Sequence, residues 1–320
     1  MSYQAKPRYA DLPVFEKTGA RHAWGVFGKD DELGSLNWIT AESVRAAAAE
    51  VRTGQVINLC LPLNLPAPPM VGSRHPLDHH VTRTRVGRDD HLDSFYLQGS
   101  TQWDGLAHVR YREFGYWGGR EEEDLDAGRL GIDRMARRGV VGRGVLIDVA
   151  AHLASLGSPV DASQRFPITP QMMDAALDWE GVQLRQGDIV LLRTGWMGWY
   201  LGLDQPARDR LAGTMTSETD PLDTPGLDPH PESAAWIWDN RVAAMAADNP
   251  ALEALRVDRE VGFLHRLLIP LIGLNIGEFF DLEELSQACA RERRYTFLLT
   301  SAPLNLPNGV GSPAGAYAII

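Results

Sequence analysis

The segment Gln98–His108 (QGSTQWDGLAH) concentrates side chains that can bind a metal ion. It contains two amides, one carboxylate and one imidazole, at Gln98, Gln102, Asp104 and His108. In a straight strand Gln98 and Asp104 would lie about 20 Å apart, at ~3.3 Å per residue, so only a compact turn brings them to one ion. Gly99 and Gly105 permit such a turn. Spacing alone also fits an ordinary turn, in which Trp103 only packs.

Two further groups have suitable residue types. His265 and Glu278 follow each other closely enough for a hairpin-like return to join them, although an isolated histidine is more often a packed core residue. The second group is a tract of histidines and aspartates, which we interpret as a solvated loop. Of its members, Asp93 is the best candidate to hydrogen-bond a metal ligand of the segment Gln98–His108, because it is nearest to that segment in the sequence. The members of the tract are His75, Asp78, His79, His80, Asp89, Asp90, His91 and Asp93.

Composition restricts the classes of function. The chain has 320 residues and a formal net charge of −11, which argues against nucleic acid or an anionic membrane as a partner. Its two cysteines, Cys60 and Cys289, fit neither a disulfide framework nor a thiolate zinc site, and they indicate a reducing compartment. The first residues contain no apolar run of signal-peptide length, and we find neither a phosphate-binding loop nor a G-x-S-x-G elbow. We therefore expect a cytoplasmic protein that acts on a small molecule.

The elements that must position these residues are apolar strands alternating with helices, which predicts an α/β protein. We expect an N-terminal arm over residues 1–35 and one domain over residues 36–320, with long loops at 64–92 and 203–231. The expected strands cover residues 56–63, 143–149, 188–193, 242–246, 271–275 and 297–301. The expected helices cover residues 41–52, 170–180, 234–238, 260–268 and 281–292.

The segment QGSTQWDGLAH resembles the signature H-x-G-T-H-x-D-x-P-x-H of the cyclase family of metal-dependent hydrolases, which includes bacterial kynurenine formamidase and isatin hydrolase. The segments DDELGSLNWIT, ITPQMMDAALDWEGVQLRQGDIVLLRTGW and SAPLNLPNGVGSPAGAYAI also look like segments of this family. The resemblance implies a single α/β domain with a mixed, barrel-like sheet and flanking helices, assembled as a homodimer or homotetramer.

Carried over by residue, the resemblance implies a metal site at five positions: Gln98, Gln102, Asp104, His265 and Glu278. Gln98 and Gln102 stand where the signature has histidine, and Leu106 stands where it has proline. Because amide oxygen is a harder ligand than imidazole nitrogen, we expect a divalent cation such as Mn²⁺, with Zn²⁺ as the alternative.

The expected function is metal-dependent hydrolysis of a small carbonyl compound: an amide, lactam, formamide or lactone. His108 would serve as general base and then as general acid. Four aromatic residues would line an apolar pocket: Trp103, Phe95, Tyr96 and Trp117. The alternatives are a catalytically silent binding protein with the same fold and a ring-closing cyclase.

Overall fold

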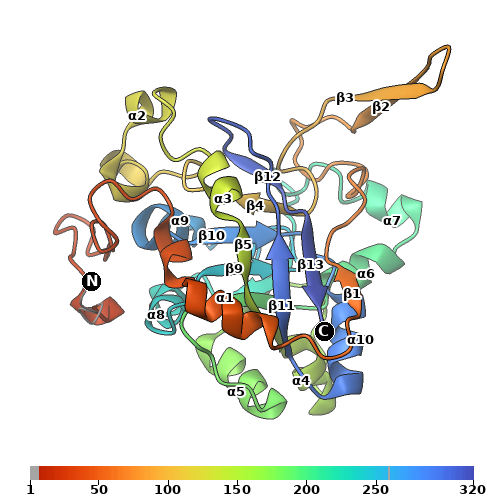
Figure 1. Ribbon diagram of the computed structural model, residues 1–320. Helices are drawn as coiled ribbons and strands as arrows, with labels where there is room; N and C mark the ends of the chain where they lie inside the picture. Colours follow the sequence, from red (N-terminus) through yellow and green to blue (C-terminus); the bar gives the residue numbers. More distant parts are fainter. Residues whose placement is uncertain (1–6, 259) are drawn as a thin grey trace.

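The computed structural model describes residues 7–258 and 260–320 of the chain. Within this part, the main element is a curled nine-stranded mixed sheet (Figure 1). Its strand order is β1-β13-β11-β5-β7-β9-β10-β4-β12. Helices flank this sheet, and the predicted α/β domain with a mixed, barrel-like sheet is confirmed. None of the helices in these ranges is long and apolar enough to cross a bilayer.

The centre of the sheet is parallel and deeply buried. Four strands form it: β5 (Val140–Asp148), β7 (Ile189–Arg193), β9 (Ala244–Ala247) and β10 (Asn275–Glu278). Such strands are nearly continuous apolar runs because both faces are covered, which is why they are readable in the sequence. Antiparallel strands complete both sides: β1 (Val56–Asn58), β13 (Ala316–Ile319) and β11 (Thr296–Ser301) on one, β4 (Gln102–Asp104) and β12 (Gly311–Pro313) on the other.

The remaining elements surround the sheet. The α-helices are α1 (Ala41–Ala48), α2 (Glu122–Asp126), α3 (Asp133–Arg138), α4 (Val149–Ser155), α5 (Pro170–Glu180), α6 (Trp196–Gly202), α7 (Gln205–Asp209), α8 (Pro231–Asp239), α9 (His265–Ile272) and α10 (Glu283–Glu292). The 3₁₀ turns are η1 (Tyr9–Asp11), η2 (Gly34–Trp38), η3 (Arg112–Phe114) and η4 (Trp117–Gly119). Two small sheets pair β2 (Asp78–Arg83) with β3 (Arg88–Asp93), and β6 (Phe166–Ile168) with β8 (Pro225–Leu227).

Local capping chemistry accounts for the helices that the sequence predicts well. Thr40 and Ser43 form a reciprocal capping box at the start of α1. Thr169 accepts a hydrogen bond from the Met172 backbone at the start of α5, and Gly181 ends that helix in the left-handed conformation. These contacts fix both helix starts at the predicted residues.

Some expected elements differ from those in the structure. Leu271, which we expect at the start of a strand, belongs instead to α9. A short apolar run fits a helix or a strand equally well, so the sequence does not separate the two. The helix expected over 260–268 begins only at His265, and Gly262 before it has a φ of +98°. The expected loop 64–92 contains strand β2 and most of β3, and the loop 203–231 contains α7 and β8. The C-terminal tail supplies β12 and β13.

The N-terminal segment lies against α9. The backbone N–H of Ala23 donates to the carbonyl of Leu271 at 2.8 Å, and Trp24 Nε1 donates to the carbonyl of Pro270 at 2.6 Å. Residues 1–6 of the expected N-terminal arm lie outside the described residues. The division at residue 35 stays a prediction.

A buried carboxyl group sits where α5 meets the carboxyl end of β5. Glu180 Oε1 accepts a hydrogen bond from the Asp148 backbone N–H at 2.7 Å, whereas Glu180 Oε2 has no hydrogen-bond partner among the described residues. Burial raises the pKa of Glu180 to about 8, and the Asp148 carboxylate adds to the rise. Glu180 is therefore protonated in the folded protein at neutral pH.

This shift makes stability depend on pH. Between an unfolded pKa of 4.5 and the folded value of about 8, the folded state keeps a proton that the unfolded state releases, so the free energy of unfolding falls as pH rises. Glu180→Gln removes that titration and keeps the acceptor for Asp148. We expect its thermal midpoint to exceed that of the parent at pH 9 and to match it near pH 5. Exposed Glu292→Gln is the control, and an equal difference at both pH values would contradict the assignment.

Candidate active site

The register between β4 and β10 brings the first group of candidate residues together. Gln102 is paired with Glu278, and Asp104 with Ile276, in an antiparallel ladder. Directly opposed residues share a face, so Gln102 Nε2 donates to Glu278 Oε2 at 2.6 Å. Asp104 lies two residues further along the same face. A ladder between segments far apart in the chain therefore assembles one amide and two carboxylates.

A turn returns Gln98 to the same place. Gln98 precedes β4, and its Nε2 donates to Asp104 Oδ1. The glycines act through close approach, not through a left-handed conformation: a Cβ on Gly105 would lie 2.8 Å from the carbonyl oxygen of Val310. A Cβ on Gly99 would lie 3.0 Å from the carbonyl oxygen of Tyr96. The compact geometry needed to join Gln98 and Asp104 is present.

His265 joins the group from the first position of α9. Its Nε2 lies 3.0 Å from Glu278 Oε1 and 3.9 Å from Asp104 Oδ2. Possible ligand atoms of Asp104, His265 and Glu278 all lie within 4.8 Å of one another, and all three residues are buried. The hairpin-like return expected for His265 and Glu278 is α9 followed directly by β10.

Glu253 holds His265 in place, and nothing in the sequence singles it out. His265 Nδ1 lies 2.6 Å from Glu253 Oε1, and the same carboxylate accepts from the backbone N–H groups of Leu264 at 2.6 Å and His265 at 3.0 Å. Glu253 thus anchors the imidazole and places a negative charge at the start of α9. A histidine held this way directs its other nitrogen toward the site, as carboxylate–histidine–metal arrangements do.

Buried negative charge sets the electrostatics of the group. Burial opposes protonation of His265, but hydrogen bonds to Glu253 and Glu278 raise its pKa well above the ordinary value. Burial and repulsion from Asp104 raise the pKa of Glu278. In the described state the positively charged imidazole of His265 offsets part of the negative charge.

His108 lies at the edge of this group, in a turn after β4. Its Nε2 is 3.7 Å from Asp104 Oδ2, and its Nδ1 is 3.0 Å from the amide nitrogen of Gln98. Burial lowers the pKa of His108. An imidazole with a lowered pKa is neutral at neutral pH and can accept a proton.

Two buried oxygens in the group have no hydrogen-bond partner among the described residues: Gln102 Oε1 and Asp104 Oδ2. Buried polar atoms are nearly always satisfied, so an orphaned pair beside three ligand-type residues fits a cation. Both glutamines present amide nitrogen to a carboxylate, Gln98 to Asp104 and Gln102 to Glu278. Gln102 already has a free oxygen, whereas Gln98 would have to turn its amide over to bind a cation.

A cavity of about 560 Å³ opens beside the group, and Gln98, Gln102, His108, His265 and Glu278 line its polar side. Its apolar side is built by Val71, Met215, Ala251, Leu255, Phe263 and Phe279. The volume is typical of small-molecule sites. Arg74 also lines this cavity and donates from Nη1 to the carbonyl of Gln98, a role that sequence reasoning missed.

The four aromatic residues expected in the pocket lie elsewhere. Trp103 is fully buried on the other face of β4, where it packs on Phe280 and donates from Nε1 to Ser301. Strand alternation explains this, because neighbours of Gln102 and Asp104 point to the opposite face. Trp117 is buried in the core and donates to Asp31. Phe95 and Tyr96 line a separate cavity of about 40 Å³.

The Glu253 contacts generate a prediction about stability. Glu253→Gln removes the carboxylate at His265 Nδ1, leaving only that of Glu278 at Nε2, and turns an N–H donor toward donors of the site. Breaking a buried charged pair costs about 3 kcal/mol or more, so the free energy of unfolding should fall by about that amount. Urea denaturation measures the change, with exposed Glu292→Gln as the control. A loss below about 1 kcal/mol would show that Glu253 does not anchor His265.

Comparisons with known proteins agree with this fold. A crystal structure described as a novel cyclase matches with 32% identity and a TM-score of 0.79, covering 93% of this chain and 99% of that one. Isatin hydrolase A from Labrenzia aggregata and from Ralstonia solanacearum each match with 18% identity and a TM-score of 0.60. They cover 86% and 88% of this chain, and 95% and 97% of their own. These last two likenesses show a shared fold.

Among curated proteins, none matches the chain. The Cyclase family model matches residues 33–254, which is more than half of the chain and includes the segment from Gln98 to His108. The last two residues of the candidate group, His265 and Glu278, lie beyond the matched range and are placed by the fold alone. The chain belongs to the cyclase family.

Proposed function

We propose that this protein is a metal-dependent hydrolase of a small carbonyl compound. The observation that carries the proposal is the buried cluster of Asp104, His265 and Glu278, whose possible ligand atoms lie within 4.8 Å of one another beside a cavity. Membership of the cyclase family supports it.

A divalent cation would be held by Asp104, Glu278 and His265 Nε2, with Gln102 Oε1 as the available amide oxygen. This donor set is mainly oxygen and contains no thiolate, which favours Mn²⁺ or a similar hard cation over Zn²⁺. When bound, such a cation polarises a carbonyl and lowers the pKa of water. Glu253 would keep His265 Nε2 directed at the site.

His108 is the side chain placed to move protons. Its Nδ1 lies 3.0 Å from the Gln98 amide nitrogen and accepts that hydrogen bond, so Nδ1 carries the lone pair of the neutral ring. If Gln98 turned its oxygen toward a cation, this nitrogen would be released to take a proton from water. The ring would then return a proton to the leaving group, as general acid–base catalysis requires.

The lining of the cavity supports our proposal for the substrate class. Its apolar wall suits a flat or aromatic ring, while Arg74 and Arg266 lie where a developing negative charge could be held. Two proteins of the same fold are named isatin hydrolases, and isatin is a cyclic amide. We therefore propose a cyclic amide, lactone or formamide of modest size.

Two alternatives use the same residues. A catalytically silent binding protein is favoured by the hydrogen bonds that Gln98 and Gln102 make to the carboxylates, since these bonds occupy positions that a cation would take. A ring-closing cyclase shares the whole site. Metal content together with a screen of lactams, lactones and formamides, run in both directions, separates the three.

The role of His108 can be tested separately from metal binding. His108→Ala should keep its metal and lose about 10²–10⁴-fold in turnover, the usual contribution of general acid–base catalysis. His230→Ala, an exposed histidine before α8, is the matched control. Elemental analysis and steady-state kinetics are the measurements. Metal loss in parallel with activity would make His108 a ligand.

The glutamines can be tested through metal preference. The metal-stripped parent should recover activity with Mn²⁺ at lower free concentration than the double variant Gln98→His with Gln102→His requires. The double variant should shift toward Zn²⁺, because imidazole replaces amide. Asp104→Asn should lose the metal in either background. If parent and double variant respond identically to both ions, the glutamines do not contact the cation.

A further inference from the structure

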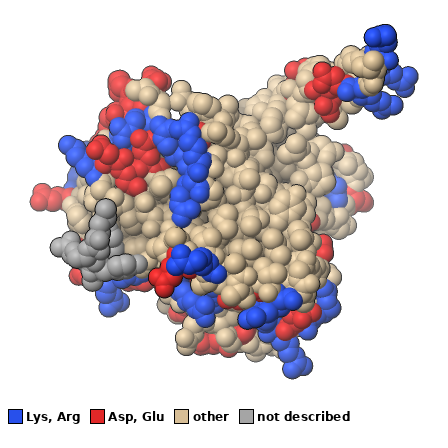
Figure 2. All heavy atoms as spheres, in the orientation of Figure 1, with Lys and Arg blue, Asp and Glu red and all other residues tan. Residues whose placement is uncertain are grey.

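The hairpin of β2 and β3 projects from the body of the protein, as Figure 1 shows. All of its residues from Asp78 to Asp93 are exposed or half-buried, so it has no face in the core. Figure 2 shows Lys and Arg gathered at its tip, where Arg83, Arg85 and Arg88 lie, and acidic side chains nearer its base. A two-stranded hairpin without a hydrophobic face is marginally stable in water, so an ion bound by both strands would add to its stability.

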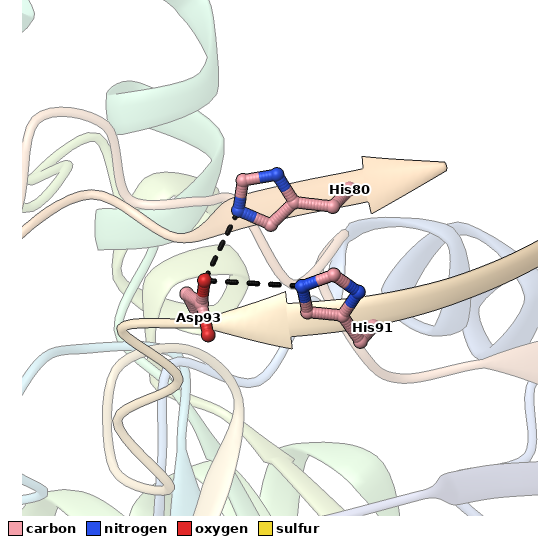
Figure 3. Close-up of side chains that lie close together, drawn as sticks. All are labelled: His80, His91 and Asp93. Carbon is pink, nitrogen blue, oxygen red and sulfur yellow. Dashed lines mark ion pairs between the residues drawn. The ribbon is translucent and has the colours of Figure 1, made fainter. Parts of the chain in front are cut away.

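Histidines and aspartates form a cluster on one face near the base of the hairpin. The register pairs His80 directly with His91, and Asp78 directly with Asp93. All four residues therefore point to the same side of the two-stranded sheet. In Figure 3 the imidazoles of His80 on β2 and His91 on β3 both direct a nitrogen at the Asp93 carboxylate.

The distances in the cluster suit a tetrahedral cation. His80 Nε2 lies 3.2 Å and His91 Nε2 lies 3.9 Å from Asp93 Oδ2, and the two rings stack with centroids 4.7 Å apart. Ligands about 2.0 Å from a tetrahedral Zn²⁺ are separated by about 3.3 Å. The three ligand atoms lie within 4.8 Å of one another, so small side-chain rotations are enough to surround one ion.

His80 supplies a second, independent observation. Its Nε2 is shielded from solvent and is in ion-pair contact with Asp78 Oδ2 at 3.1 Å and Asp93 Oδ2 at 3.2 Å, but makes no hydrogen bond among the described residues. Two carboxylate oxygens thus crowd a nitrogen without the alignment of a hydrogen bond. The imidazole and the two carboxylates are therefore close enough to share an ion.

We propose that the hairpin carries a second metal site, which binds Zn²⁺ or a similar borderline divalent ion through His80, His91 and Asp93, with Asp78 or water as the fourth ligand. Two imidazoles and a carboxylate are a typical zinc donor set, unlike the mainly oxygen donors of the central group. The sequence-based interpretation of this tract as a solvated loop misses the strand pairing that aligns the ligands.

The bound ion would clip the two strands together where they leave the body of the protein. The chain leaves β3 toward Gln98 and enters β2 from Arg74, and both of these residues line the central cavity. Because the ion binds only the paired strands, it stabilises the hairpin by mass action. The proposal does not depend on whether the central group binds metal.

The test counts zinc ions on the full chain without an affinity tag. Equilibrium dialysis against Zn²⁺ and elemental analysis are applied to the parent, to the double variant His80→Asn with His91→Asn, and to His79→Asn. His79 lies on the opposite face of the hairpin, 2.9 Å from Asp90, and is the matched control. We expect the double variant to hold one ion fewer than the parent, and His79→Asn to hold the same number.

A single-ligand variant checks the geometry. Asp93→Asn should raise the Zn²⁺ dissociation constant of this site by more than the roughly 10–100-fold that loss of an outer contact costs. Circular dichroism establishes that the variants are folded. We expect them to fold, because none of the substituted side chains is buried in the core. The difference of one ion is expected whether the central group takes zinc or not, so it does not rest on the proposed function. Equal zinc content in the parent and the double variant overturns the proposal.

Discussion

Buried negative charge is the constraint on which the centre of this protein depends. Asp104, Glu253 and Glu278 are all buried, and each ionised carboxylate costs several kcal/mol to remove from water unless it is compensated. The surroundings supply that compensation in several forms: the imidazole of His265, the start of α9, and the amides of Gln98 and Gln102. This compensation is incomplete at Gln102 Oε1 and Asp104 Oδ2, which have no hydrogen-bond partner among the described residues. The proposed cation would supply further positive charge beside that of His265.

The sequence predicts those parts of the fold that local chemistry determines. The starts of α1 and α5 follow from Thr40 and Thr169, and the parallel strands follow from runs such as DIVLLR. It cannot predict which strands become neighbours, because the pairing of Gln102 with Glu278 joins segments far apart in the chain. Most of the candidate group comes from the family resemblance, and Glu253 leaves no signal because a lone glutamate between apolar residues has no distinctive spacing. Trp103 lies away from the cavity because strand alternation turns it to the face opposite Gln102 and Asp104.

In this protein the family fold determines where the candidate group lies, whereas the side chains determine what the group can bind. The cyclase scaffold places one strand pair and one helix start around a common point, and this arrangement does not require a particular ligand set. The side chains at that point decide what is bound, and two of them, Gln98 and Gln102, are neutral amides. An amide offers an oxygen or an N–H according to how it is turned, so Gln98 is satisfied by the carboxylate of Asp104 in the described state. The amide of Gln98 can therefore either donate to Asp104 or turn its oxygen toward a cation, but it cannot do both with the same atom.

Strand β4 has β10 on one side and β12 on the other, so its pairing is completed only after β12 has been synthesised. A ribosome adds roughly 5–20 residues per second, so β12 emerges about 10–40 s after the ligand-bearing segment, some 200 residues later. Until then Gln102 and Asp104 belong to an incomplete sheet, whose unpaired edge is a target for chaperones and for aggregation. Strand β12 carries no residue of the candidate group, yet it covers the edge of the strand that bears Gln102 and Asp104.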